Sequence, residues 1–310
     1  MNIVFMGTPD FAVPSLRMLL DEGYHVVAVV TQPDRPQGRK RVLKPTPVKE
    51  VAAEYGIPVL QPQRLRSPEA VAELAAYKPD LIVTAAYGQI LPKAVLDMPA
   101  NGCVNIHGSL LPKYRGGAPI QRCIIGGESE TGVTLMYMAE GLDTGDMISR
   151  VKVAIADEDT SGTLFDKLSI AGAALLKEQM PRLIAGRVQA EVQDEQQATY
   201  APNLKREDEK IDWSRAARDI YNQIRGLVPI SGAFCFWNGE VFKVWASRKS
   251  DAASKDAAPG TVLQLTEQGI EVKTGDASLW LTRIQPSGKK QMEAGEFVRG
   301  NTMAPGTVLE

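Results

Sequence analysis

The chain has 310 residues, of which 44% are hydrophobic and 23% charged, and its formal net charge is −2. The length allows two domains, and the composition is that of a soluble globular protein. No apolar run reaches the roughly 18 residues of a membrane-spanning helix, and the N-terminal residues lack the basic segment and cleavage site of a secretory signal. We therefore expect a cytoplasmic protein with no membrane partner, and the near-neutral charge does not by itself indicate a nucleic-acid partner.

The cysteines and histidines bear on disulfides and metals. Cys103, Cys123 and Cys235 are odd in number and form no Cys-x-x-Cys pair, so we expect no disulfide framework. His25 and His107 lie far apart, and neither has a cysteine at ligand spacing. No metal site is predicted, although these residue types leave open a site made of carboxylates alone.

The first half of the chain alternates short apolar runs with helical patterns. Thr8 as the N-cap, with Pro9 at the first helical position, predicts a helix that ends at Gly23. Several apolar runs are almost wholly apolar, as strands covered on both faces must be. The alternation predicts an α/β fold with a Rossmann-like, doubly wound, mostly parallel sheet. The expected strands are residues 2–6, 26–31, 59–60, 81–85, 103–106 and 133–138.

The organisation changes after a long helix expected at residues 162–184. Residues 189–206 are polar with little apolar periodicity, and we interpret them as a linker between domains at residues 1–188 and 207–310. An amphipathic helix is expected at residues 211–225. Five short strands then predict a small closed β-barrel, with Asn238-Gly239 as a hairpin turn. They are residues 233–236, 241–245, 261–265, 270–273 and 278–284.

Polar side chains gather at the end of the strand at residues 103–106. Asn105 and His107 stand two residues apart there, so they project from the same face of the sheet. They lie at the exit of the strand, and open α/β sheets bind ligands beyond the carboxyl ends of their strands. Asp143 follows the strand at residues 133–138 in an acidic loop, and it can approach His107 if the two strands are neighbours. Such a trio suits acyl transfer to an amine: Asn105 and protonated His107 would donate to the developing oxyanion. Asp143 would favour the imidazolium and help to move protons.

Two other interpretations of these segments have to be weighed. From the residue types alone, Asn105 and His107 are more commonly a structural hydrogen-bonding pair than a catalytic one. A nicotinamide nucleotide is disfavoured, because the turn after the first strand has only Gly7 where dinucleotide-binding folds carry Gly-x-Gly-x-x-Gly. Asp10 would also lie unfavourably close to a pyrophosphate.

A basic stretch at residues 34–49 contains one acid, Asp34. Its prolines and Gly38 are expected to prevent regular structure, which predicts a protruding loop. Runs of charge are usually solvated surface, and the alternative is a loop that contacts the phosphates and unpaired bases of an RNA. The basic residues are Arg35, Arg39, Lys40, Arg41, Lys44 and Lys49.

The residues from His107 to Gly116, reading HGSLLPKYRG, resemble the signature of the folate-dependent formyltransferases, as do Asn105 before them and LDTGD at residues 142–146 after them. The resemblance is close from residue 1 to about residue 153 and looser beyond. It implies that Asn105, His107 and Asp143 take the catalytic positions and that 10-formyltetrahydrofolate is the co-substrate. It also implies two walls of a folate cleft, formed by Ser109, Leu110, Leu111 and Pro112 and by Tyr87, Gly88, Gln89 and Ile90.

The resemblance also bears on the acceptor. Family members with a basic loop at this position and an OB-like barrel act on methionyl initiator tRNA, so the resemblance implies a tRNA partner and makes Arg39, directly after Gly38, the most important side chain of the loop. Relatives that formylate an amino sugar nucleotide share the catalytic trio, and that acceptor is the alternative. A catalytically idle RNA-binding protein is the rival from another class. We expect a monomer.

Overall fold

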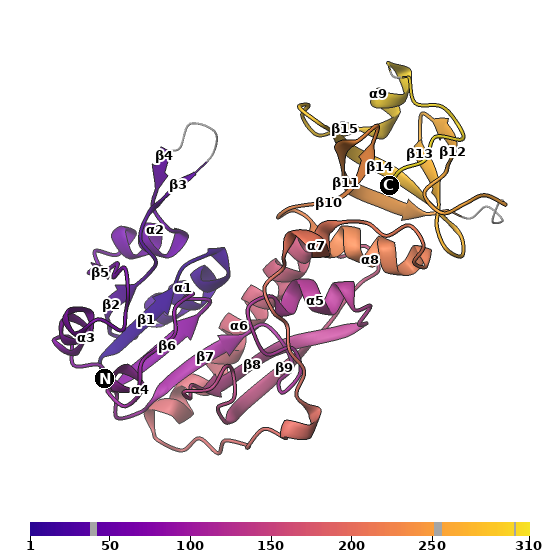
Figure 1. The fold of residues 1–310 in the computed structure, drawn as a ribbon. Helices are drawn as coiled ribbons and strands as arrows, with labels where there is room; N and C mark the ends of the chain where they lie inside the picture. Colours follow the sequence, from indigo (N-terminus) through magenta and orange to yellow (C-terminus); the bar gives the residue numbers. More distant parts are fainter. Residues whose placement is uncertain (38–41, 251–255, 301) are drawn as a thin grey trace. The chain divides into compact units, whose positions relative to one another are not determined.

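The computed structural model describes residues 1–37, 42–250, 256–300 and 302–310 (Figure 1). The described residues form two compact units. The first comprises Met1–Pro119, Glu130–Ala154 and Phe165–Ala201, and the second comprises Ile120–Ser129, Ile155–Leu164 and Pro202–Glu310. Two short segments that precede residue 165 therefore pack with residues 202–310.

A seven-stranded sheet organises the first unit, in the order β5-β2-β1-β6-β7-β8-β9. The strands from β5 to β7 are parallel, whereas β8 and β9 each run antiparallel to the preceding strand. Every residue of β1 and β6 is buried, as expected for strands covered on both faces. The predicted Rossmann-like, mostly parallel sheet is thus confirmed. Its strands are β1 Ile3–Gly7, β2 Val26–Val30, β5 Val59–Leu60, β6 Leu81–Ala85, β7 Cys103–His107, β8 Glu130–Tyr137 and β9 Met147–Ala154.

The prediction of a helix that begins at Thr8-Pro9 is wrong. Pro9 is extended, with φ −82° and ψ 177°, a 3₁₀ turn follows, and α1 begins at Val13. A helix begun at Pro9 would carry Pro14 in its second turn, where the missing N–H and the ring break the hydrogen-bond ladder. The helical elements up to residue 197 are η1 Asp10–Ala12, α1 Val13–Asp21, α2 Pro47–Glu54, α3 Pro68–Ala75, α4 Lys93–Leu96, α5 Pro119–Ile125, α6 Ser161–Ile184 and η2 Glu195–Gln197.

The basic stretch contains regular structure, so the prediction of a wholly irregular loop at residues 34–49 is wrong. β3 Arg35–Gln37 pairs antiparallel with β4 Val42–Lys44. A two-stranded ribbon tolerates Pro36 because both of its strands have a free edge. Pro47 opens α2, where its missing N–H costs nothing. The hairpin projects beyond α2 (Figure 1).

The core of the second unit lies between an antiparallel sheet and α8. The strand order is β10-β11-β14-β13-β12, with β15 paired to β14. The hairpin predicted around Asn238-Gly239 is confirmed, and both residues have the positive φ that such turns need. β10 and β12 lie at the two ends of the strand order of this sheet and do not pair with each other. Residues 307–310 hydrogen-bond to both of them: Phe236 N donates to Glu310 O at 2.7 Å, and Val262 N donates to Thr307 O at 2.8 Å. The C-terminal tail therefore completes the barrel. The strands are β10 Ala233–Trp237, β11 Glu240–Lys249, β12 Val262–Thr266, β13 Gly269–Lys273, β14 Ser278–Pro286 and β15 Met292–Glu293.

The amphipathic helix of the second unit begins later than residue 211. Asp212 accepts a hydrogen bond from the backbone N–H of Ser214 and holds a turn there. The N–H of Ala217 is capped at 2.7 Å by the carboxylate of Asp276. The helices are α7 Arg206–Glu209, α8 Ala217–Leu227 and α9 Ala294–Arg299. Across the described parts of the chain, no helix has the combination of length and apolar character needed to cross a membrane.

Candidate active site

β7 holds the first two members of the predicted trio. Asn105 and His107 project from the same face of β7 near its carboxyl end. β7 lies between β6, which is parallel to it, and β8, which is antiparallel. Only 6% of His107 is exposed, and Asn105 is half-buried. Because β7 is hydrogen-bonded to a strand on each side, the backbone that carries these side chains is held in place.

The amide of Asn105 is oriented by the neighbouring strand. The hydroxyl of Thr84, on β6, donates to Asn105 Oδ1 at 2.8 Å, and Thr84 itself is only 1% exposed. The other end of the amide, Nδ2, forms no hydrogen bond within the described residues. Because the oxygen is engaged from behind, the amide presents its donor end to a ligand.

The imidazole of His107 lies between two acceptors. Its Nε2 is 3.0 Å from the carbonyl oxygen of Tyr114, which can only accept, so Nε2 carries a hydrogen. Its Nδ1 is 3.6 Å from Oδ2 of Asp143, beyond ordinary hydrogen-bond length. The imidazole therefore has the carbonyl oxygen of Tyr114 on its Nε2 side and the carboxylate of Asp143 on its Nδ1 side.

Asp143 reaches His107 although β8 runs antiparallel to β7. The last residue of β8, Tyr137, lies opposite Val104, so the loop at residues 138–146 has to fold back toward His107. Asp143 adopts φ +52°, and its Oδ2 accepts from the N–H of Gly116 at 2.8 Å. The structure thus brings the predicted trio together.

The predicted folate-binding residues after β7 are mostly buried. Ser109, Leu111 and Pro112 are buried and Leu110 is half-buried. The hydroxyl of Ser109 donates to the carbonyl oxygen of Lys113 at 2.6 Å, which closes the loop on itself. These side chains fix the shape of the loop, and only part of Leu110 remains available to a ligand.

Of the predicted folate-binding residues after β6, two have side chains that are buried or hydrogen-bonded, and two are open to a ligand. Burial raises the pKa of Tyr87 to about 12, and its hydroxyl is buried without a partner in the described residues. The side chain of Gln89 is occupied, because it accepts from the N–H of Leu65 at 2.7 Å and donates to Pro62 O at 3.1 Å. Gly88 has φ +88°, and Ile90 is 85% exposed. This loop therefore offers a ligand main chain and one apolar side chain.

The basic hairpin carries two exposed cations on facing strands. Arg35 and Lys44 are directly opposite each other in the register of β3 and β4. Lys49 is paired within the protein, because its amine lies 2.6 Å from the carboxylate of Asp34. The hydrogen bonds from Lys49 and Gln61 lower the pKa of the Asp34 carboxyl. The predicted tRNA-binding residues Arg39, Lys40 and Arg41 lie outside the described residues.

Three side chains that were not among the predicted residues support this site. Thr84 orients Asn105, as described above. Arg115 and Gln193 bond to each other beside the loop of Asp143. Arg115 lies within the HGSLLPKYRG run, which is a signal; Gln193 lies in a polar segment whose composition gives none.

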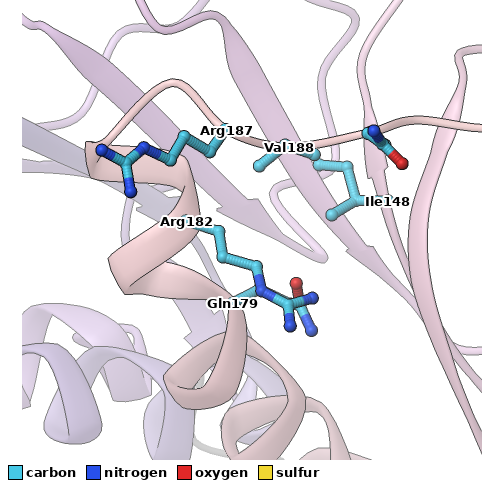
Figure 2. A pocket seen from close by; sticks show the side chains of 6 residues that line it. Ile148, Gln179, Arg182, Arg187 and Val188 are labelled. Carbon is cyan, nitrogen blue, oxygen red and sulfur yellow. The ribbon is translucent and has the colours of Figure 1, made fainter.

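Within the part of the chain that the structure describes there is no metal cluster, and a cavity in the first unit lies apart from the trio. Among the described residues, no group of three or more His, Cys, Asp or Glu side chains could hold a metal ion. A cavity of about 400 Å³ elsewhere in the first unit shares no residue with the trio, and its Arg182 lies beside Gln179 on α6 whereas Arg187 points away from both (Figure 2). Its guanidinium groups therefore do not converge on one ligand. The lining residues are Ile148, Gln179, Arg182, Arg187, Val188 and Gln189.

Comparisons with known proteins cover nearly the whole chain. Residues 1–180 match the family described as formyl transferase, and residues 203–302 match the formyl transferase C-terminal domain. A methionyl-tRNA formyltransferase of Bacillus subtilis (strain 168) is 58% identical over 309 residues, covering 99% of this chain and 97% of the relative. One from Halalkalibacterium halodurans is 56% identical over 312 residues, covering 100% and 98%.

Solved structures share the fold at low identity. An N-formyltransferase from Helicobacter canadensis, in complex with folinic acid and dTDP-3-aminofucose, has a TM-score of 0.68 at 21% identity, covering 92% of this chain and 98% of that one. HypX from Aquifex aeolicus, in complex with tetrahydrofolic acid, has a TM-score of 0.66 at 19% identity, covering 95% of this chain. This chain spans only 46% of HypX.

Proposed function

The chain belongs to the formyl transferase family, and on this premise we propose that it transfers a formyl group from 10-formyltetrahydrofolate to the amino group of methionyl initiator tRNA. The observation that carries the reaction is the imidazole of His107, held between a carbonyl oxygen and Asp143 on the same strand face as the free amide end of Asn105. Relatives of the same length that are 50–58% identical support the acceptor.

Asn105 and His107 stabilise the charge that develops during transfer. The folate, when bound, supplies the formyl carbonyl, whose oxygen gains negative charge as the amine attacks its carbon. Asn105 Nδ2 donates to that oxygen from a fixed position, because Thr84 holds the other end of the amide. His107 contributes Nδ1–H, the donor that has no hydrogen bond of ordinary length to Asp143.

Asp143 lies beside the imidazole of His107 and assists proton movement. A bond forms between the amine nitrogen and the formyl carbon, the bond from that carbon to the folate nitrogen breaks, and the amine proton passes to that nitrogen. Asp143 is only 17% exposed, so its charge acts on the imidazole with little solvent screening. No serine or cysteine nucleophile is required, and no metal is needed.

The loops after β6 and β7 fit a folate. A pterin needs apolar surface beside main-chain donors and acceptors. Exposed Ile90, the open backbone at Gly88 and the accessible part of Leu110 offer both. The remaining predicted residues hold these loops in shape. They are Tyr87, Gln89, Ser109, Leu111 and Pro112.

The hairpin β3–β4 is suited to the acceptor end of a tRNA. Arg35 and Lys44 face each other across the ribbon, an arrangement that costs stability unless an anion lies over it, and a phosphate supplies one. Val42 and Leu43 are exposed beside them and can contact unpaired bases. Arg39, Lys40 and Arg41 extend the proposed interaction beyond the described residues.

The remaining elements of the proposal concern the chain as a whole. Residues 1–188 contain the catalytic trio, residues 189–206 lead from them to the C-terminal part, and residues 207–310 form a second, OB-like surface for tRNA. The protein acts as a cytoplasmic monomer. Small OB-like barrels commonly bind oligonucleotides, which is the physical basis for the second surface.

One assay tests donor, acceptor and reaction together. Purified protein is given 10-formyltetrahydrofolate with methionyl initiator tRNA, with free methionine or with an amino sugar nucleotide. Transfer to the charged tRNA alone is expected. Transfer to the sugar nucleotide would keep the catalytic site and refute the acceptor, and transfer to none of the three would refute the reaction.

A further inference from the structure

Residues 191–201, which we call the strap, are hydrogen-bonded to the loops on both sides of the active site. At one end, Glu191 and Met147 exchange backbone hydrogen bonds of 2.8 Å at the start of β9. At the other, Thr199 O accepts from the N–H of Arg115 at 2.8 Å, and Ala201 N donates to Arg115 O at 2.7 Å. The strap is therefore fixed to the first unit and is not a loose connection.

Two buried side chains join the strap to the loop of Asp143. Arg115 is 0% exposed, and its Nε and Nη2 donate to Gln193 Oε1 at 3.1 and 2.9 Å. Gln193 is 5% exposed, and its Nε2 donates to the carbonyl oxygens of Asp143 and Gly145 at 2.8 and 2.7 Å. Glu195, also on the strap, accepts from the outer face of the Arg115 guanidinium at 2.7 and 2.9 Å.

These bonds act on a backbone that needs support. Asp143 has φ +52°, in the left-handed region that non-glycine residues occupy only when their surroundings hold them there. Its carboxylate is fixed by the N–H of Gly116. Its carbonyl oxygen and that of Gly145 are fixed by Gln193. Gly116 follows Arg115 in the chain, and Gln193 accepts hydrogen bonds from the Arg115 side chain. One buried network therefore sets the position of Asp143 relative to His107.

We propose that Arg115 and Gln193 are positioning residues, which hold Asp143 at the distance from His107 that formyl transfer needs. The inference rests on the proposed function. A displacement of about 1 Å in a catalytic group can cost about 10²-fold in rate, and the 3.6 Å between His107 and Asp143 leaves little margin. Both hydrogens and the oxygen of the Gln193 amide have partners, so this amide has one defined arrangement.

Gln193→Glu separates this role from simple packing. The carboxylate keeps both acceptor interactions with Arg115 and the same size, but it places an oxygen where Nε2 now donates to two carbonyl oxygens. We expect kcat to fall roughly 10- to 100-fold while KM for tRNA and folate stays near the wild-type value. The thermal midpoint serves as the control for folding.

Gln197→Glu is the matched control, because Gln197 is an exposed residue of the same strap whose side chain, among the described residues, bonds to Asp194 alone. It makes the same charge change, and its activity should stay within about twofold of wild type. Equal losses in both variants would refute the proposal, since charge on the strap would then explain them. A raised KM with unchanged kcat for Gln193→Glu would refute it too.

A double-mutant cycle asks whether Gln193 acts through Asp143. Gln193→Glu should slow the Asp143→Asn protein far less than it slows wild type, because the group it positions is already disabled. The same fold-loss in both backgrounds would overturn the proposal. Wild-type enzyme with no formyl transfer to any of the three acceptors would instead refute the proposed function. If wild type prefers the sugar nucleotide, the cycle is measured with that acceptor.

Discussion

Thr84→Val tests whether the hydroxyl on β6 directs the amide of Asn105. Thr84 is 1% exposed, and valine has its shape, so the substitution opens no cavity. It removes the 2.8 Å hydrogen bond to Asn105 Oδ1, together with the hydroxyl's contacts to Val104 O at 3.0 Å and Met138 Sδ at 3.2 Å. The amide is then free to rotate, and its oxygen can turn toward the position where the formyl oxygen must lie.

The expected loss is that of about one hydrogen bond, well below that of a whole oxyanion donor. An intramolecular hydrogen bond contributes about 0.5–1.5 kcal/mol, which corresponds to roughly 2- to 12-fold. Removing an oxyanion donor costs about 10²–10³-fold, which is the expectation for Asn105→Ala. We therefore expect kcat of Thr84→Val to fall by roughly 3- to 10-fold, and Thr84→Ser, which keeps the hydroxyl, to fall less.

Single-turnover formylation with excess enzyme measures the chemical step for both variants and for Asn105→Ala with and without Thr84→Val. The second substitution should add little to the first, because an orienting group has nothing to orient once the amide is gone. A wild-type rate for Thr84→Val, or a loss of the same size in the Asn105→Ala background, would show that Thr84 does not act through Asn105.

Three further predictions concern the imidazole, the hairpin and the thiols. His107→Ala should lower kcat roughly 10²–10³-fold with tRNA affinity unchanged, and near-normal turnover would place the centre elsewhere. The double substitution Arg35→Ala with Lys44→Ala should weaken tRNA binding. In binding titrations at several salt concentrations, the slope of log K against log salt concentration should fall in size by about 1 for each cation that no longer meets a phosphate. An unchanged slope would show that the hairpin is ordinary solvated surface. Burial raises the pKa of Cys103 and Cys235 to about 12, so both stay protonated at pH 8 and should react with a thiol reagent only after unfolding, and rapid labelling of the native protein would contradict this.

The buried part of the sheet could be predicted from sequence because its strands are runs of apolar residues. β1 and β6 are covered on both faces, and a short, almost wholly apolar run is typical of such strands. β9 was missed because it is an edge strand whose residues are mostly half-buried or exposed. The reversal of β8 was missed as well, because an apolar run has the same composition in either direction.

The site was predictable where its residues are close in sequence. Asn105 and His107 share a strand, so alternation alone places them on one face. Asp143 required the assumption that two strands are neighbours. Thr84 and Gln193 act across 21 and 50 residues respectively, from a buried strand and a polar segment. Their roles depend on which atoms meet in the fold, and no local pattern carries that information.

The reversal of β8 also explains why Asp143 needs the strap. If β8 were parallel to β7, the loop after it would begin beside His107. In the antiparallel arrangement β8 ends opposite Val104, three residues and so about 10 Å from His107. The loop must return over that distance, with Gly145 packed so closely on Tyr137 O that no side chain fits and Asp143 left-handed. Such a loop has no strand partner of its own to fix its position. The hydrogen bonds from Gly116 and Gln193 therefore hold Asp143 in the place that a parallel strand would have given it directly.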